Sequence, residues 1–428
     1  MGDTFSPANP DPLSMLAAAR ERTLALATLL EPAQWLGPRL RIVNPPLWEI
    51  GHLGWFEERW CLRQHGRSSG SLPGNADALY DSAAVAHDMR WDLPLPDVPE
   101  TLRMLAGIRA AVEEQCRRNG DDAGLRYFVE LCALHEEMHC EALTYTRQTL
   151  DYPEPHAKTA AVRAGVCTGD VEIEGGRFML GAVVDGQFVF DNEKWAHTVD
   201  IRPFRMSRTA VSNARFAEFV EAGGYVNRDW WDDDGWSWRC SIDAQQPLYW
   251  HRAGGGWLRR RYGREEPLMP DEPVIHVNWH EASAWCRWAG RRLPSEAEWE
   301  FAASTVPGQP GLKRRYPWGN GPPEAGTANL HGVAGDVVPA SALAAGDSAW
   351  GIRQMIGNVW EWTADWFQPY PGFVRDPYAE YSEPWFGNHK VLRGGCHATR
   401  ACLIRNTWRN FYTPDRRDVF AGFRTCAL

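Results

Sequence analysis

The chain has 428 residues, of which 44% are hydrophobic and 23% are charged, and a formal net charge of -10 at pH 7. These values are typical of a globular protein and exclude a disordered chain, while the length allows two domains that each bury a core. The negative charge and the lack of a dense basic stripe argue against nucleic acid as a partner. Because the sequence contains neither an export signal nor about 18 consecutive apolar residues, we expect a cytoplasmic protein with no membrane contact.

The first 150 residues carry helical periodicity in four stretches. Pro32 follows the first stretch and Gly120 follows the third, and both residue types are common where helices stop. Four amphipathic helices joined by loops predict a helix bundle. The stretches cover residues from about 12 to 31, 47 to 65, 99 to 118 and 124 to 150.

The pattern changes after this half. Two prolines, small residues and no sustained period are typical of a linker, which we place at 156–168 between domains at 1–155 and 169–428. Short β-like runs among Gly, Pro and Trp then predict an irregular α+β domain with long loops. We expect strands within 171–180, 197–207, 273–279 and 390–396, and helices at 212–222 and 280–289.

The stretch "ALHEEMHCEAL", residues 133–143, places His135 and His139 four apart on a predicted helix. Residues at this spacing lie one above the other on a helix, so two imidazoles can bind one ion. The motif also matches HExxH, in which Glu136 would be the general base of a zinc hydrolase.

The hydrolase interpretation needs a further zinc ligand downstream. Ala142 and Tyr145 occupy the Gly and His positions of one known continuation, and Glu154 is a weak match to another. A zinc hydrolase therefore stays an alternative. A carbohydrate-binding lectin-like protein with a structural metal is a second one.

His52, in "WEIGHLGWFEERW", offers a third nitrogen from another predicted bundle helix. Buried among Trp and Leu, an imidazole needs a polar partner. Three neutral nitrogens with open positions opposite suit a non-haem Fe(II) that must bind both O₂ and substrate. Histidines alone do not distinguish iron from zinc.

The second half resembles the formylglycine-generating-enzyme-like domain, a C-type-lectin-like fold. The matching stretches follow one another in order and include "PVIHVNWHEASAWCRWAGRRLPSEAEWEFAA", "YPWGN", "GIRQMIGNVWEWTADWF" and "VLRGGCHATRACLIRNTWRNFYTPDRRDVFAGFR". With a DinB-type helical domain in front, nearly the whole chain is similar to the ergothioneine-type sulfoxide synthases. The resemblance implies an α+β protein, in which a DinB-like four-helix bundle precedes the lectin-like domain. It also implies that His52, His135 and His139 hold the iron.

Members of that family join a thiol to C2 of the imidazole of hercynine, using O₂ and leaving a sulfoxide. A related class, the selenoneine synthases, uses a selenosugar and forms a carbon–selenium bond. The resemblance therefore implies hercynine, a thiol or selenosugar, and O₂ as small-molecule substrates.

This chain departs from the mycobacterial-type members where they bind γ-glutamylcysteine. Met138 stands in place of a Gln, and the loop at 79–96 has Arg90 alone in place of several arginines. Their Asn-Trp-Asp corresponds here to Asn410, Phe411 and Tyr412. We therefore expect a different chalcogen donor, with the selenosugar leading and cysteine or γ-glutamylcysteine as the alternative.

The trimethylammonium group of hercynine cannot donate hydrogen bonds, so aromatic faces are suitable partners. "NTWRNFY" supplies Trp408, Phe411 and Tyr412 with Asn410 between them, although all can equally be core residues.

A proton donor is expected to be a tyrosine. By resemblance, "DPYAEYSEP" supplies Tyr378 as the preferred donor and Tyr381 as its neighbour at the substrate, while in another branch the donor corresponds to Tyr80.

True formylglycine generation would need two copper-binding thiolates five residues apart. Cys396 and Cys402 are six apart, so we expect no such site, and the ten cysteines, which form no CxxC pair, should be reduced. "GNVWEW", residues 357–362, is expected to be structural, with calcium as a conceivable occupant. Structural roles are also expected for His87, His197, His276, His280 and His397.

Overall fold

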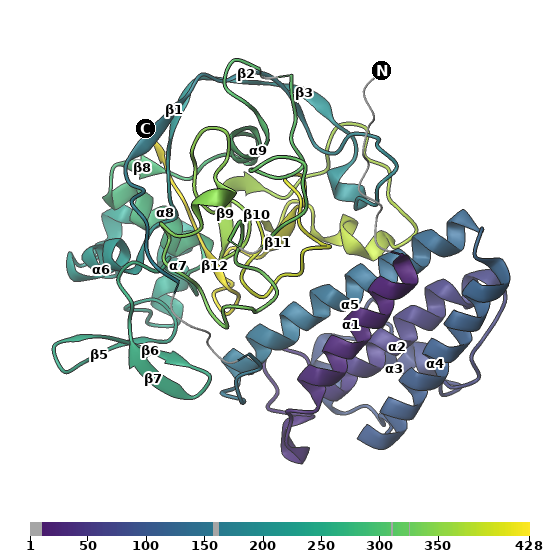
Figure 1. The fold of residues 1–428 in the computed structure, drawn as a ribbon. Coiled ribbons are helices and arrows are strands. Elements are labelled where there is room, and N and C mark those ends of the chain that lie inside the picture. The colour runs from purple at the N-terminus through teal and green to yellow at the C-terminus, as the bar shows by residue number, and fades with distance from the viewer. Residues whose placement is uncertain (1–10, 157–161, 310, 325) are drawn as a thin grey trace. The chain divides into compact units, whose positions relative to one another are not determined.

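The computed structural model describes residues 11–156, 162–309, 311–324 and 326–428. The chain divides into two compact units, Met1–Pro155 and His156–Leu428 (Figure 1). The expected linker lies at the start of the second unit, and its residues 157–161 lie outside the described part. The first unit is helical and the second mixes short strands and helices, so the α+β fold class is confirmed.

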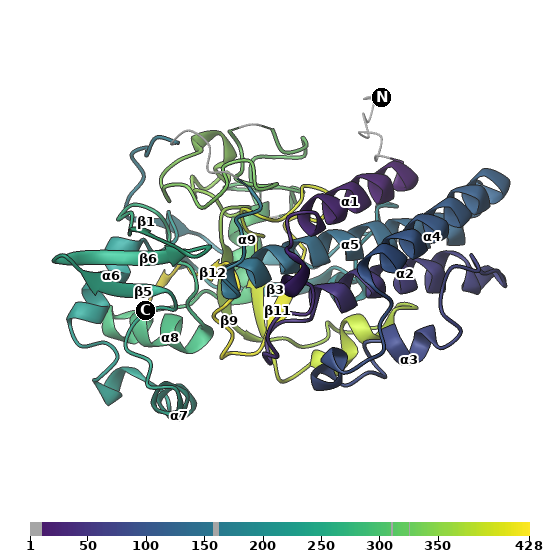
Figure 2. The ribbon, with the colours of Figure 1, turned by 90° about the horizontal axis from the view of Figure 1, so that it is seen from below.

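From residue 11 onward, where the structure describes it, the first unit contains four long helices, as predicted, and one short helix. α1 and α2 each begin with a proline, whose fixed φ suits a first helical turn. Both helices end about four residues before the predicted positions. In the second stretch, the chain passes from α2 into a 3₁₀ turn that stops at Gly66, which has φ of 68°. α1 packs on α5, and α2 packs on both α4 and α5 (Figure 2). The helices are α1 (Pro12–Ala27), α2 (Pro46–Cys61), α3 (Ala76–Tyr80), α4 (Val98–Asn119) and α5 (Ala123–Thr149).

The described residues of the second unit form four small sheets. Two have four strands, in the orders β1-β4-β13-β8 and β11-β10-β9-β12, and the others pair β2 with β3 and β5 with β6 and β7. The strands are β1 (Asp170–Ile173), β2 (Gly176–Leu180), β3 (His197–Ile201), β4 (Phe204–Ser207), β5 (Trp250–Ala253), β6 (Gly256–Arg261), β7 (Arg264–Pro267), β8 (Arg291–Arg292), β9 (Trp360–Trp366), β10 (Lys390–Arg393), β11 (Asn410–Tyr412), β12 (Ala421–Gly422) and β13 (Cys426–Ala427).

In the same described part of the unit, four α-helices accompany these sheets. Two of them, α6 and α8, match the predicted helices, and the other two were missed. Asn278 and Ser295 cap α8 and α9 through their side chains, each with a glutamate three residues on that bonds back. The helices are α6 (Asn213–Glu221), α7 (Asp233–Ser241), α8 (Trp279–Trp288) and α9 (Glu296–Ser304).

The strand expected within 273–279 is wrong. Apart from one isolated bridge between Ser212 and Pro273, the segment is irregular, and His276 has φ of 61°, which a continuous strand does not allow. Val274 and Val277 are nevertheless buried, so the apolar residues that indicated a strand serve the core as irregular chain. Across the described residues, no helix has the length and apolar character that crossing a bilayer requires.

Candidate metal centre

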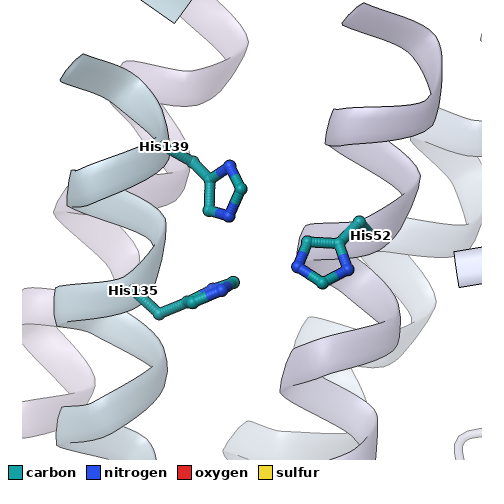
Figure 3. A group of neighbouring side chains, drawn as sticks. All are labelled: His52, His135 and His139. Atoms are coloured by element: carbon teal, nitrogen blue, oxygen red, sulfur yellow. The ribbon is translucent and has the colours of Figure 1, made fainter. Parts of the chain in front are cut away.

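Three histidines of the helical unit meet between two helices. His52 lies on α2, and His135 and His139 lie one turn apart on α5 (Figure 3). One ring nitrogen from each lies within 4.8 Å of the others, and among the described residues no other group of three or more His, Cys, Asp or Glu is arranged to hold a metal. The structure therefore brings together the three residues that the sequence singled out.

Protein acceptors orient two of these imidazoles. The Nδ1 of His139 lies 2.7 Å from Oε1 of Glu49, and the Nδ1 of His52 lies 2.8 Å from the carbonyl oxygen of Tyr80. Each contact fixes the ring and leaves Nε2 as the nitrogen that can bind a metal. The third ring, His135, stacks on Phe56 with centroids 3.7 Å apart and planes 7° apart.

Burial keeps the inner histidines neutral. Burial, together with a smaller effect of the neighbouring His139, lowers the pKa of His52 to about 3, while the bond to the Tyr80 carbonyl opposes the shift. Burial, followed by the two other histidines, also brings the pKa of His135 well below its ordinary value. Neutral imidazole is the form that binds metal, so this donor set fits a divalent transition metal with open positions.

The short helix α3 forms a wall beside His52. The indole of Trp48 stacks on His52, with centroids 5.0 Å apart and planes 10° apart, and its Nε1 donates to the carbonyl of Leu79 at 2.7 Å. Trp55 stacks on the same imidazole at 5.6 Å, and its Nε1 donates to Asp77 at 2.6 Å. These contacts tie α3 to the face of α2 that carries His52.

Tyr80, one of the two predicted proton donors, ends α3 and is fully buried. Its ring occupies the space above Gly51, where an added Cβ would lie 2.3 Å from the ring carbon Cε1. Within the described part of the chain, its hydroxyl has no hydrogen-bond partner. Burial raises the pKa of Tyr80 to about 12, so the hydroxyl keeps its proton at neutral pH.

Arg90 is buried within the helical unit, with 9% of its surface exposed. Its guanidinium lies 3.8 Å from the ring centroid of Trp48 and donates to the side chain of Asn44 at 2.6 Å. Longer bonds reach the carbonyls of Ser82 and Val85. Its role as a substrate-binding residue stays a prediction, as does that of the half-buried Met138 on α5.

Glu136, the general base of the hydrolase alternative, is engaged elsewhere. Arg20 donates to both of its carboxylate oxygens, at 2.7 and 3.2 Å, and the hydroxyl of Thr23 donates to Oε1 at 2.7 Å. A carboxylate held by a buried arginine is poorly placed to take a proton from water. The geometry therefore gives the hydrolase no support.

The predicted tyrosines of the second unit, Tyr378 and Tyr381, are half-buried; Tyr378 precedes one 3₁₀ turn and Tyr381 is its last residue. Their rings lie 6.0 Å apart, and Tyr381 stacks on Phe190 at 4.4 Å. Burial raises the pKa of Tyr381.

The predicted aromatic substrate contacts lie around β11. Phe411 is half-buried and stacks on Phe367 at 4.0 Å, and Tyr412 next to it has Arg416 5.0 Å from its ring centroid. The amide oxygen of Asn410 accepts from the backbone N–H of Phe411 at 2.8 Å. Trp408 is a buried residue that packs edge-on against Trp360.

The "GNVWEW" motif uses its polar side chains within the protein. Glu361 accepts two bonds of 2.6 Å from Arg424 and one of 2.7 Å from the indole of Trp299. The amide oxygen of Asn358 accepts from Asn329 and from the backbone N–H of Val338. These two side chains are therefore engaged within the protein, and calcium at the motif stays a prediction. Cys396 and Cys402 do not form a disulfide.

Sequence reasoning missed Glu49. Its signal was present, because Glu49 precedes His52 by three residues in "WEIGH" and both should therefore lie on one face of the predicted helix. What the pattern does not reveal is that the carboxylate reaches across to His139 on α5.

Comparison with known proteins agrees with this architecture. Residues 156–427 match the sulfatase-modifying factor enzyme 1-like domain family, and residues 15–143 match the DinB superfamily. Similar proteins named hercynine oxygenase come from Mycolicibacterium thermoresistibile, with 38% identity over 96% of this chain and 93% of the relative, and from Mycobacterium tuberculosis, with 37% identity over 96% of each. The formylglycine-generating enzyme of Streptomyces coelicolor is 33% identical and covers 64% of this chain and 92% of its own.

Both domains and almost the whole length are thus shared with the first two relatives, while the third lacks a counterpart to much of the chain. The chain belongs to the ergothioneine-type sulfoxide synthase family, in which a DinB-type helical domain precedes a formylglycine-generating-enzyme-like domain.

Proposed function

We propose that the protein is an O₂-dependent non-haem iron enzyme that forms a carbon–chalcogen bond at C2 of the imidazole of hercynine. The observation that carries this proposal is the cluster of His52, His135 and His139 on two helices of a DinB-type unit. Support for hercynine as the substrate comes from relatives of that name that match nearly the full chain.

The three histidines would hold Fe(II), and the iron, when bound, would supply the redox chemistry with O₂. The protein contributes neutral ring nitrogens, because burial opposes protonation of His52 and His135. Orientation comes from Glu49 and the carbonyl of Tyr80.

For the chalcogen donor we propose a selenosugar, with cysteine or γ-glutamylcysteine as the alternative. The reaction of a selenol RSeH with the C2–H of the imidazole and O₂ gives RSe(O)–imidazole and water, which balances all atoms. Four electrons leave the organic substrates, two for the new C–Se bond and two for the selenoxide. Support for a donor without carboxylates comes from Arg90, whose guanidinium is already engaged by Trp48 and Asn44.

Binding of the trimethylammonium group is assigned to aromatic faces of the second unit. Phe411 and Tyr412 are half-buried on β11 and keep part of their surfaces for a ligand. Asn410, Trp408 and Tyr381 complete the proposed substrate contacts, although the ring of Trp408 is largely covered by protein.

For the proton donor, the contacts favour Tyr80 over Tyr378. The Tyr80 carbonyl bonds to one metal-binding histidine, and its hydroxyl is buried with no partner in the described residues. A buried hydroxyl of raised pKa is suited to give its proton only when charge develops nearby. Tyr378, which the sequence preferred, is half-buried and remains the alternative.

The test is anaerobic loading with Fe(II), followed by hercynine, O₂ and one of three donors: selenosugar, cysteine or γ-glutamylcysteine. We expect mass spectrometry to detect a hercynine selenoxide in the first reaction, with O₂ consumed in equal amount. Preference for γ-glutamylcysteine would refute the donor and leave the metal assignment standing. Purified protein that keeps zinc and consumes no O₂ after iron loading would refute the proposed function itself.

A further inference from the structure

The carboxylate of Glu49 is buried beside the histidine cluster. Only 1% of the Glu49 surface is exposed, and its Oε1 lies 2.7 Å from Nδ1 of His139. The contact crosses from α2 to α5, so α2 provides both the ligand His52 and the partner of a ligand on the other helix. A negative group in this position would be costly to bury without a compensating positive charge.

Arg90 is a buried positive group near enough for its charge to act on the Glu49 carboxylate. The nearby Glu49 carboxylate raises the pKa of Arg90, against burial, which is the larger effect and lowers it to about 10. The same guanidinium lies 3.8 Å from the ring centroid of Trp48, and Trp48 stacks on His52. Arg90 thus acts on the surroundings of the cluster in two ways, through its charge on the Glu49 carboxylate and through the ring of Trp48, which stacks on His52.

The two oriented histidines have unequal partners. His52 bonds to a neutral carbonyl, whereas His139 bonds to a carboxylate. An imidazole that donates to a carboxylate is the more basic ligand and gives more electron density to a bound metal. The pairing with a carboxylate therefore makes His139 the stronger of these two donors.

We propose that Glu49, balanced by Arg90, is a positioning residue that holds His139 for the metal and supplies a negative charge to the centre. This inference rests on the proposed function, because it takes the three histidines as metal ligands. It assigns Arg90 to support of the metal centre, which distinguishes this chain's arginine from one that receives a substrate carboxylate.

The test measures metal affinity in the full-length protein and does not depend on turnover. Metal-free wild type, Glu49→Gln and Glu58→Gln are titrated anaerobically with Fe(II) against a chromophoric chelator, and with Co(II) to record its visible absorption. Glu58 is the matched control, because it is another buried carboxylate of α2 but bonds to Ser68 and Ser69. Glu49→Asp tests rescue, since it keeps the charge on a shorter side chain.

We expect Glu49→Gln to weaken Fe(II) binding by about 10- to 100-fold and to shift the Co(II) spectrum. Glu58→Gln should match wild type, and Glu49→Asp should recover part of the affinity. Equal affinities and equal Co(II) spectra for wild type and Glu49→Gln would overturn the inference. If Glu49→Gln does not fold, as judged by circular dichroism, the same comparison is made with Glu49→Ala, which also removes the carboxylate, and wild-type affinity and spectrum there would overturn it. Failure of wild type to bind Fe(II) would instead refute the proposed function.

Discussion

The two units bury polar groups in different ways. In the helical unit, three imidazoles face one another and burial keeps two of them uncharged. In the second unit, Arg393 is 0% exposed and lies between two carboxylates, 2.8 Å from Glu296 and 2.5 Å from Glu300. Charges that already neutralise each other have no need of a ligand, whereas converging neutral nitrogens are suited to receive a cation. We therefore expect the three histidines to serve metal binding, and the ion cluster of Arg393, Glu296 and Glu300 to stabilise the fold.

Removing a histidine of the cluster should have the largest effect. His139→Ala leaves two nitrogens in place of three, so we expect iron content after anaerobic loading to fall to background and product formation to cease. Elemental analysis of the desalted protein measures the first effect. His87→Gln is a control in the same unit, because His87 bonds to the carbonyl of Val43 and lies outside the cluster. Full iron occupancy in His139→Ala would contradict the ligand set.

Removing the Tyr80 hydroxyl should separate catalysis from folding. Tyr80→Phe deletes a buried hydroxyl that has no partner in the described residues, so stability should be unchanged or slightly higher. Formation of the hercynine product should fall by about 10²- to 10⁴-fold, the usual contribution of a general acid. The initial rate of product formation measures this loss, with Tyr378→Phe compared in parallel. If only Tyr378→Phe loses product, the sequence-based preference for Tyr378 is correct.

Breaking the ion cluster of the second unit should affect stability and spare the metal. Arg393→Met leaves Glu296 and Glu300 without one of their buried partners, and we expect a loss of about 3–5 kcal/mol in the free energy of unfolding. Urea unfolding monitored by tryptophan fluorescence gives this value. Iron bound per folded molecule should stay at the wild-type level.

The control for this prediction is Arg177→Ala, which removes an exposed pair with Asp200 at 3.4 Å. Exposed pairs contribute about 0–1 kcal/mol, so little change is expected. A loss below 1 kcal/mol in Arg393→Met would show that the two clusters do not differ as described.

The smallest expected effect is a pH dependence of stability from His276. Burial, aided by Arg259 and opposed by Asp336, lowers its pKa in the folded protein to about 3. Because the unfolded chain takes up the proton first, near pH 6.5, stability from this group falls as the pH decreases from about 6.5, with a slope of at most about 1.4 kcal/mol per pH unit.

Asparagine tolerates the positive φ of position 276, so His276→Asn should fold and show a shallower slope than wild type between pH 7 and 5. The difference between the two unfolding series isolates this histidine from the others. Identical slopes would exclude His276 as a contributor.

The sequence predicts the helical unit well because its signals are local. Apolar periodicity locates four helices, and the spacing of His135 and His139 places both rings on one face. That His52 joins them depends on how α2 packs against α5, and the sequence supported it through family resemblance rather than through spacing. Glu49 and Tyr80 are brought to the cluster by the same packing, which no local pattern describes.

The second unit is harder to predict because buried irregular chain and buried strands have similar composition. The apolar residues of segment 273–279 would suit a buried strand as well as buried irregular chain. The positive φ of His276, which the sequence does not reveal, is what distinguishes the two. Helix α9 was missed although Ser295 and Glu298 form a capping box that can be recognised in "SEAE". The hairpin of β5 and β6 was also missed, despite its Gly254–Gly255 turn.

The attachment of α3 to α2 has a practical consequence for engineering. Three successive contacts, from Trp48 to Leu79, from His52 to Tyr80 and from Trp55 to Asp77, fix this segment against the face of α2 that carries His52. Grafting a loop of another length from a relative, in order to exchange the chalcogen donor, would also turn the imidazole of His52. Donor exchange and iron loading should therefore be selected together, with α2 and α3 transplanted as one cassette.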